Sequence, residues 1–349
     1  MNRRTCLKAL VCSLVLTAGF NSALGVAQPT IQPQIPSSLF QVFGTWPEPI
    51  EIKRVLAANE AAAVMLNSVA PAQLVGWPTA LNQTSLSWLS ASSAKLPVIG
   101  ALEGTELPLS LDQLRDLSPD VIVAVGDGTP QQQAQAERVS TASGIPYVLI
   151  KGQLQDAAEQ LLWLGSLLGQ QRHGQQLAST AQQVLDLAQP VASSAPTVYW
   201  AEGETGLKTT TASSDLSQVF QVAGLKNVVP EAGAPEITLE QIKTWKPDFI
   251  LTADPAFYQH VFEELDWQEV SAVQNQRVFF VPQVPFGWLD KPASINRLLG
   301  IQWLAAVVQQ KPEHELINEL RHLFIMLYQT DPGVEQLQQL LATPMQFAD

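Results

Sequence analysis

One stretch of the chain occurs twice, and this repeat limits the possible folds more than any other feature. Residues 110–123 read SLDQLRDLSPDVIV and residues 238–251 read TLEQIKTWKPDFIL, which align without a gap. Leu, Gln, Pro, Asp and Ile recur at the same places, and Ser pairs with Thr, Asp with Glu and Arg with Lys. The repeat predicts two lobes that share one local structure.

Each copy has the pattern of a short helix followed by a buried strand. It begins with Ser or Thr and has Gln three residues later, as in Ser110 with Gln113 and Thr238 with Gln241. In this capping box the hydroxyl and the amide satisfy each other's free backbone N–H groups. A proline in each copy then ends the helix, because the residue before proline is disfavoured in the α region. Apolar runs follow, as in parallel strands buried on both faces.

The rest of the chain fits an α/β protein of two lobes, each with a parallel sheet flanked by helices. A chain of 349 residues exceeds the usual ~100–200 of one domain. Strand-like runs alternate with helical patterns, and a proline-free helical stretch lies between the two series. We expect one long connecting helix there, and three helices at the end of the chain. The expected segments are a signal at 1–27, an extended segment at 28–50, the first lobe at 51–152, the connecting helix at 153–190 and the second lobe with the terminal helices at 195–349.

The first residues have the pattern of a secretory signal that is cleaved near Ala27. A basic start, MNRRTCLK, precedes an apolar run that is shorter than the ~20 residues needed to cross a bilayer. Arg3 and Arg4 resemble the twin-arginine export pattern, and an ordinary basic start explains them equally well. Phe20 stands where a lipoprotein would have its lipid-bearing cysteine, so we expect a periplasmic protein without a lipid anchor.

The composition of the mature chain excludes several functions. Its only cysteines, Cys6 and Cys12, lie in the signal, which excludes disulfides, thiolate metal sites and cysteine nucleophiles. Loss of the three basic residues of the signal makes a net charge of −13 more negative by three. Such a surface repels nucleic acid and anionic lipid headgroups, so neither is an expected partner.

Candidate ligand-binding residues follow from the positions where strands end, because ligands of open α/β sheets collect beyond the carboxyl ends of the strands. Trp77 could wall a planar ligand or cover the edge of a lobe. In the loop that begins at residue 284, charged residues could face an anionic or chelated ligand or form a local ion-pair cluster. The candidates are Trp77, Asp127, Lys208, Phe286, Trp288, Asp290 and Arg297.

The two lobes, the repeated S/T-x-D/E-Q unit, the proline-free connector and the export signal together resemble the periplasmic substrate-binding proteins of ABC importers for ferric siderophores, haem and cobalamin. The resemblance implies a monomer that holds an iron chelate, haem or a corrinoid between its lobes and delivers it to a permease and ATPase complex. It also implies that Asp112 and Glu240 dock onto permease arginines. Without the resemblance, these acids would simply be favourable charges at helix N-termini.

Four other functions remain as alternatives. A small oxyanion such as molybdate would suit Lys208 and Arg297, whereas the aromatic residues favour a bulky chelate. A bare metal site needs several histidines from both lobes, and the four histidines of the chain leave the first lobe without one. No nucleophile elbow or phosphate loop supports an enzyme. A surface protein that uses the same lobes without transport is the last alternative.

Overall fold

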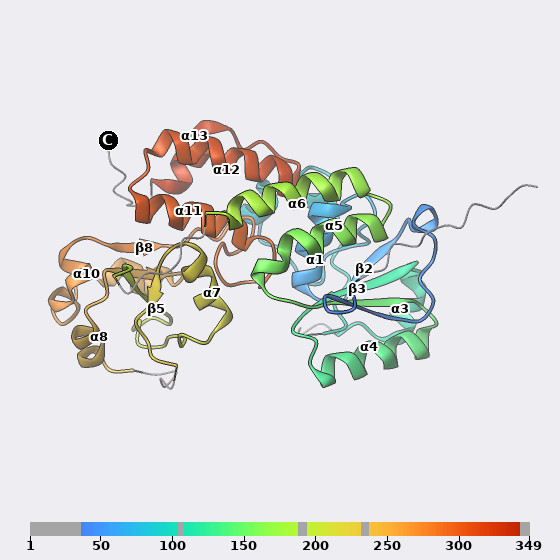
Figure 1. Cartoon of the computed structure of the whole chain (residues 1–349), viewed down its shortest axis with the longest axis horizontal. Helices are drawn as coiled ribbons and strands as arrows, with labels where there is room; N and C mark the ends of the chain where they lie inside the picture. The colour runs from blue at the N-terminus through green and yellow to red at the C-terminus, as the bar shows by residue number, and fades with distance from the viewer. Residues whose placement is uncertain (1–35, 104–107, 188–193, 232–236, 343–349) are drawn as a thin grey trace, which may run out of the picture. The chain divides into compact units, whose positions relative to one another are not determined.

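The computed structural model describes residues 36–103, 108–187, 194–231 and 237–342. The expected signal at 1–27 lies outside these residues. Two four-stranded sheets form the centres of two lobes, as Figure 1 shows. Among the described residues, no helix has both the length and the apolar character that a membrane crossing requires.

The first sheet has the strand order β1-β4-β3-β2 and is parallel apart from one edge strand. Its strands are β1 (Phe40–Phe43), β2 (Val55–Ala57), β3 (Val121–Val125) and β4 (Tyr147–Ile150). β1 pairs antiparallel with β4, from Phe40 opposite Ile150 to Phe43 opposite Tyr147. β1 lies within the extended segment expected at 28–50, and its backbone completes the edge of the first sheet.

The second sheet has the order β6-β5-β7-β8 and is parallel throughout. Its strands are β5 (Thr197–Ala201), β6 (Lys226–Asn227), β7 (Phe249–Thr252) and β8 (Val278–Phe280). The α/β class with a largely parallel sheet in each lobe is thus confirmed. Outside the named strands, isolated bridges join Val55 to Leu74 and Trp77 to Val98.

Both copies of the repeated unit fold as the sequence predicts. Helices α3 (Leu111–Leu117) and α8 (Leu239–Trp245) each begin with a complete capping box. The residue before each proline, Ser118 or Lys246, ends its helix in the left-handed conformation, with φ of 45° and 51°.

The aspartate after each proline has a structural role. Asp120 accepts hydrogen bonds from the backbone N–H groups of Lys53 and Arg54, at 2.7 and 2.8 Å. Asp248 accepts one from the backbone N–H of Thr197 at 2.7 Å. Each aspartate therefore ties the start of its own strand to the start of the neighbouring strand.

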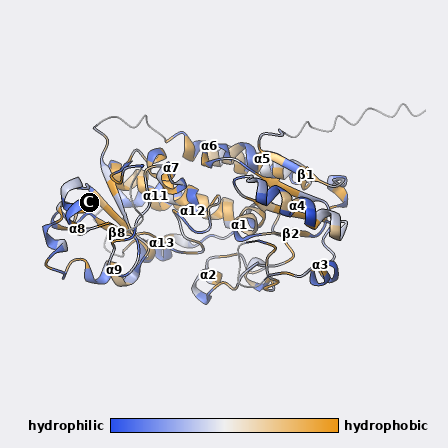
Figure 2. Ribbon diagram, turned by 90° about the horizontal axis from the view of Figure 1, so that it is seen from below, coloured by the Kyte–Doolittle hydropathy of each residue, from blue (hydrophilic) through white to orange (hydrophobic). Residues whose placement is uncertain are grey.

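The remaining helices of the two lobes surround the sheets (Figure 1). In the first lobe, α1 has eight buried residues, whereas only three residues of α4 are buried. Figure 2 shows the same contrast, with α1 largely apolar and α4 largely polar. These helices are α1 (Glu60–Val69), α2 (Gln83–Ser87), α4 (Pro130–Ser143), α7 (Asp215–Val222), α9 (Pro255–His260) and α10 (Ser271–Gln274).

The segment between the lobes is a pair of helices and not the one long helix that was predicted. α5 (Ala157–Leu167) and α6 (Gln171–Leu185) lie side by side (Figure 1). The chain turns at Gly169, whose φ of 73° is strained for any residue with a Cβ. Gly165 and Gly174 allow the two helices to touch backbone against backbone.

The three terminal helices form where the sequence predicts them, as α11 (Arg297–Gln309), α12 (Glu313–Tyr328) and α13 (Gly333–Leu341). α11 packs against α6 and α7, whereas α12 packs against α1 and α6. The amide of Gln329 donates to the carbonyl of Ser68 at 3.2 Å. The terminal helices therefore contact both lobes.

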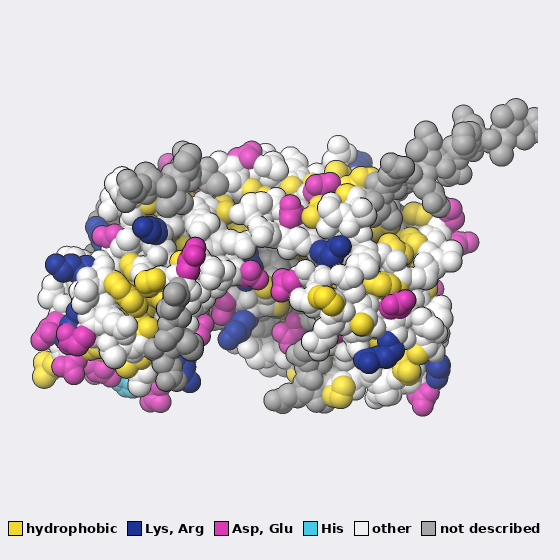
Figure 3. Space-filling model, turned by 60° about the horizontal axis from the view of Figure 1, so that its bottom comes forward, with side chains coloured by type: hydrophobic (Ala, Val, Ile, Leu, Met, Phe, Trp, Pro, Cys, Tyr) yellow, Lys and Arg dark blue, Asp and Glu magenta, His cyan; other side chains and the backbone are white. Residues whose placement is uncertain are grey.

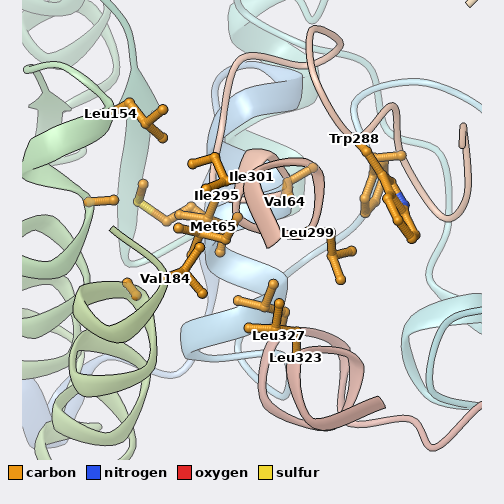
Figure 4. Packing of buried hydrophobic residues seen from close by; sticks show 14 of the residues in the cluster. Val64, Met65, Leu154, Val184, Trp288, Ile295, Leu299, Ile301, Leu323 and Leu327 are labelled. Atoms are coloured by element: carbon orange, nitrogen blue, oxygen red, sulfur yellow. The ribbon is translucent and has the colours of Figure 1, made fainter. Parts of the chain in front are cut away.

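One hydrophobic core continues through both lobes. It includes Val55 and Val121 of the first sheet and Val198 and Leu251 of the second. Met65 of α1 lies among side chains of α6, of α11 and of the loop before α11, as Figure 4 shows. Two smaller cores cover the other faces of the sheets. Because burial of apolar side chains is the main favourable term in folding, this shared core holds the lobes together.

Candidate functional site

A pocket of about 510 Å³ has walls from both lobes and from the loop before α11. It lies where ligands of α/β sheets are expected, because Val125 ends β3 and Gly152 follows β4. Figure 3 shows a hollow in the middle of one face, with Asp and Glu side chains on both of its sides. The lining residues are Ala61, Met65, Val125, Gly126, Asp127, Gly152, Gln153, Leu154, Ala157, Gln160, Asp215, Gln218, Ala293, Ser294, Ile295 and Arg297.

Arg297 is the cation in the lining of this pocket, and the residue is 8% exposed. Its Nε donates to the carbonyl of Leu289 at 3.0 Å. Among the described residues, its terminal nitrogens Nη1 and Nη2 have neither a hydrogen-bond acceptor nor an ion-pair partner. Burial lowers the pKa of Arg297, while the charges of Asp215, Asp290 and Asp127 raise it. The group stays charged, because the pKa of a guanidinium lies far above neutrality.

The loop before α11 positions Arg297 through backbone contacts. The indole Nε1 of Trp288 donates to the carbonyl of Val284 at 2.8 Å, and the amide of Asn296 donates to the carbonyl of Gly287. Gly300 lets the loop lie directly on α11, since a Cβ there would be 2.2 Å from the Trp288 carbonyl oxygen. The guanidinium is therefore fixed before any ligand arrives.

Ser294 joins this loop to the first lobe. Its hydroxyl donates to the carbonyl of Ala61 in α1, at 2.8 Å and across 233 positions of the chain. Ser294 does not cap α11, which begins after Asn296 without a side-chain cap among the described residues.

The three predicted aromatic ligand contacts are buried in the core and do not line the pocket. Trp77 is 2% exposed, and its Nε1 donates to the carbonyl of Ser93 at 2.9 Å. The Phe286 ring packs between Trp77 and Tyr328, with ring centroids 5.8 and 5.9 Å away. Trp288 is fully buried. The prediction that these rings contact the ligand does not fit the pocket around Arg297. Phe286 packs on Trp77 and on Tyr328 of α12, and Trp288 packs on Trp303 of α11 and Phe324 of α12.

The charged candidates separate into two groups. Asp127 and Arg297 line the pocket, whereas Lys208 and Asp290 do not belong to its lining. Lys208 is exposed, and its backbone pairs with that of Glu202. Burial raises the pKa of the Asp290 carboxyl, while the neighbouring Lys291 lowers it. Among the described residues, no ion pair joins Asp290 to Arg297, so the alternative of a direct ion-pair cluster is not supported either.

Sequence reasoning missed Asp215 and Gln218 of α7, which bring the second lobe into the pocket. Asp215 follows the helix cap Ser214, where an acid is ordinarily explained by the helix dipole. The signal that could have identified it is the position of this helix start, directly after a strand and its loop.

The predicted docking acids are exposed at matching places in the two lobes. The side chain of Asp112 is 92% exposed and that of Glu240 is 82% exposed. Asp112 pairs with Arg115 at 3.0 Å and Glu240 with Lys243 at 3.2 Å, in each case three residues along the helix.

The histidines of the described residues belong to no metal-binding cluster. In the same part of the chain, no three His, Cys, Asp or Glu side chains gather in a way that could hold a metal ion. The Nε2 atom of His173 lies 2.8 Å from the carbonyl oxygen of Ser68, which gives this side chain a structural partner between α6 and α1.

Comparison with known proteins identifies the family. The model of the periplasmic binding protein family matches residues 78–285, more than half of the chain. The vitamin B12-binding protein of Vibrio cholerae is 26% identical over 193 residues, which span 53% of this chain and 66% of that protein. The match thus spans just under two thirds of this relative.

Solved structures show the same fold. An ABC transporter solute-binding protein from Sulfurospirillum deleyianum is 27% identical, with a TM-score of 0.75, and the match covers 85% of this chain and 96% of that one. The molybdate-binding protein MolA of Haemophilus influenzae, solved with molybdate, is 18% identical, with a TM-score of 0.61 and coverages of 82% and 95%. The second likeness concerns the fold alone.

Proposed function

Because the chain belongs to the periplasmic binding protein family, we propose that it is the substrate-binding component of an ABC importer. It captures a metal chelate, such as a ferric siderophore, haem or a corrinoid, in the pocket around Arg297 and delivers it to a membrane permease and its ATPase. The relatives named above are binding proteins, which supports a binding function over an enzymatic one.

The observation that carries this proposal is the nearly buried guanidinium of Arg297, at the wall of a pocket between the lobes. Its terminal nitrogens have no partner among the residues that the structure describes. Keeping a cation out of water is costly unless it is paired. A ligand that offers an anionic group or a carbonyl oxygen would repay this cost. Arg297 lies beyond the family match, which ends at residue 285, so the family match alone does not name the ligand.

Pocket size favours a chelate over the alternative, a bare oxyanion such as molybdate. A volume of about 510 Å³ falls within the ~300–1,000 Å³ of sites for drug-sized ligands. A single tetrahedral oxyanion would leave most of this space to water. The support for a bulky ligand therefore comes from the pocket and no longer from the aromatic residues.

The test is a calorimetric titration of the purified protein with ferric hydroxamates, haem, cyanocobalamin and molybdate. We expect one chelate to bind, and Arg297→Gln to weaken it at least tenfold. The matched control is Arg277→Gln, an exposed arginine that lies over the Phe249 ring outside the pocket. Binding of molybdate alone would overturn the chelate proposal in favour of the oxyanion.

Docking to the permease is proposed for Asp112 and Glu240. Their exposure and their matched places in the two lobes support a role that folding does not require, since exposed ion pairs contribute little stability. Asp112→Arg combined with Glu240→Arg should keep ligand affinity and abolish uptake by cells. Glu137→Arg with Glu315→Arg changes the net charge equally at exposed sites and should leave uptake intact. Normal uptake by the first double variant would refute docking.

Export is proposed to depend on residues 1–27, with cleavage near Ala27. The basic and apolar pattern of this segment supports the proposal. Mass spectrometry of the protein from the periplasm should find a mature N-terminus near residue 28. A chain that keeps residues 1–27 after export would contradict it.

A further inference from the structure

The pocket contains three charged side chains, and each comes from a different segment. Asp127 follows β3 in the first lobe, Asp215 is the first residue of α7 in the second, and Arg297 begins α11. Both carboxylates are exposed, whereas Arg297 is nearly buried. The lining therefore combines one inner cation with two outer carboxylates.

The backbone around each carboxylate holds it in place. Beside Asp127, a Cβ on Gly126 would lie 2.3 Å from the side-chain Nε2 of Gln132, and the side-chain Oε1 of Gln132 accepts from the Gly128 N–H at 2.9 Å. Asp215 follows Ser214, whose hydroxyl accepts from the Ser217 N–H at 3.3 Å. Hydrogen bonds next to each acid therefore fix the backbone that carries it.

The carboxylates affect Arg297 without pairing with it. Their charges raise the pKa of Arg297. Even so, the ion pairs found among the described residues do not include Arg297. Its terminal nitrogens thus remain available to a ligand, while the lining as a whole has one more negative charge than positive. The charge of Asp290 also raises the pKa of Arg297, and the cation Lys291 lies next to Asp290 in the chain.

Resting on the proposed function, we propose that Asp127 and Asp215 form a charge filter. Ligands with a cationic centre beside the oxygen atoms that Arg297 binds are favoured, and anionic chelates and bare oxyanions are disfavoured. An anion would gain one attraction to Arg297 and meet two repulsions from the carboxylates. A cationic or zwitterionic chelate would gain attraction at both ends. Such interactions between partly exposed charges weaken as salt is added.

A first experiment tests the charge filter without any natural ligand. Ala293 is exposed and lines the pocket, so Ala293→Cys places a thiol there in the full chain that carries Cys6→Ser and Cys12→Ser. The reaction rates of this thiol with a cationic and an anionic methanethiosulfonate reagent are measured, each relative to a free thiol. The ratio of the two rates cancels the fraction of thiolate and reports the local potential.

We expect the cationic reagent to be favoured about tenfold, and this ratio to fall to about two when Asp127→Asn and Asp215→Asn are added. High salt should lower the ratio in the same direction. A ratio that stays the same in the double Asn variant would overturn the charge filter, as would a preference for the anionic reagent. Either outcome leaves the proposed transport function standing.

A second experiment tests selection of the ligand itself. Two ferric trihydroxamates of similar size are compared, a linear one with a pendant ammonium group and an uncharged cyclic one, together with the cationic and neutral forms of cobalamin. The cationic member of a bound pair should bind about tenfold more tightly, and the double Asn variant should remove the difference. Equal affinities in the wild type would refute the filter. Failure of all chelates to bind, with the thiol result intact, would refute the proposed function instead.

Discussion

Gly165 of α5 and Gly174 of α6 lie so close that a Cβ added to Gly165 would be 2.7 Å from the Cα of Gly174, and one added to Gly174 would be 2.8 Å from the Cα of Gly165. Backbone opposes backbone at this point, so no side-chain rotation can relieve the contact. The distance between the two connecting helices is set here.

Gly165→Ala should therefore lower the free energy of unfolding by about 1–3 kcal/mol, the usual cost of overpacking. In an unobstructed helix the same change would stabilise the protein by about 1 kcal/mol through helix propensity. Urea unfolding measures the difference. Gln175→Ala, at an exposed site beside Gly174, is the control and should change stability little. A stabilised Gly165→Ala variant would show that the helices can separate.

Trp77→Ala should lower the free energy of unfolding by about 3–5 kcal/mol, because it empties a buried ring site. Trp77→Phe should cost less, since it keeps much of the packing and loses the hydrogen bond to the Ser93 carbonyl. Chemical denaturation gives stability, and ligand titration of the folded Trp77→Phe protein gives affinity. If Trp77→Phe lost affinity for the ligand and kept its stability, the prediction that Trp77 contacts the ligand would be supported after all.

Ser110→Ala and Thr238→Ala should each lower the free energy of unfolding by about 0.5–2 kcal/mol, because each removes a helix cap. Asp112→Asn and Glu240→Gln, in the same helices, should change it by less than about 0.5 kcal/mol, as for exposed ion pairs. Thermal and urea unfolding compare the four. If Asp112→Asn or Glu240→Gln lowered the free energy of unfolding as much as the loss of a cap, the acids would have a role in the fold and not in docking.

Acid sensitivity should depend on Asp331. Hydrogen bonds from Arg321 and from the Gly333 N–H lower the pKa of this carboxyl from 3.8 to about 2. A carboxyl with a lowered pKa binds fewer protons in the folded chain, so its stabilisation is fully present above about pH 4 and is lost as the pH falls toward 2.

Asp331→Asn should then reduce stability at pH 6 and leave it nearly unchanged at pH 2, relative to the wild type. Denaturant unfolding at both pH values measures this. Asp266→Asn, an exposed acid without a hydrogen-bond partner among the described residues, should have little effect at either. An equal loss at both pH values would show that the Asp331 charge is not responsible.

The parts of the fold that are determined by residues close together in the sequence were predictable. The capping boxes, the prolines that end α3 and α8 and the apolar runs of β3 and β7 act within one short stretch, so their sequence determines them. β1 was missed because its pairing with β4 joins residues such as Phe40 and Ile150, which are far apart in the chain.

Only part of the pocket lining could be predicted, for the same reason. Asp127 could be predicted because it comes just after the end of a strand, and Arg297 because it comes just after a distinctive loop. Phe286 was misplaced because it packs on Tyr328, from a helix near the end of the chain that was expected to belong to the second lobe. Asp215 was missed because an acid in the first turn of a helix is already explained by its favourable interaction with the helix dipole.

The contact of α12 with α1 determines how this protein can be divided. Residues 313–328 follow the second sheet in sequence, yet they cover a helix that begins at Glu60. A fragment that ended after β8 would expose apolar side chains of α1 and would lose the hydrogen bond from Gln329 to Ser68. A boundary drawn between the lobes therefore yields no pair of self-sufficient fragments, and heat or denaturant should melt both lobes in one cooperative step.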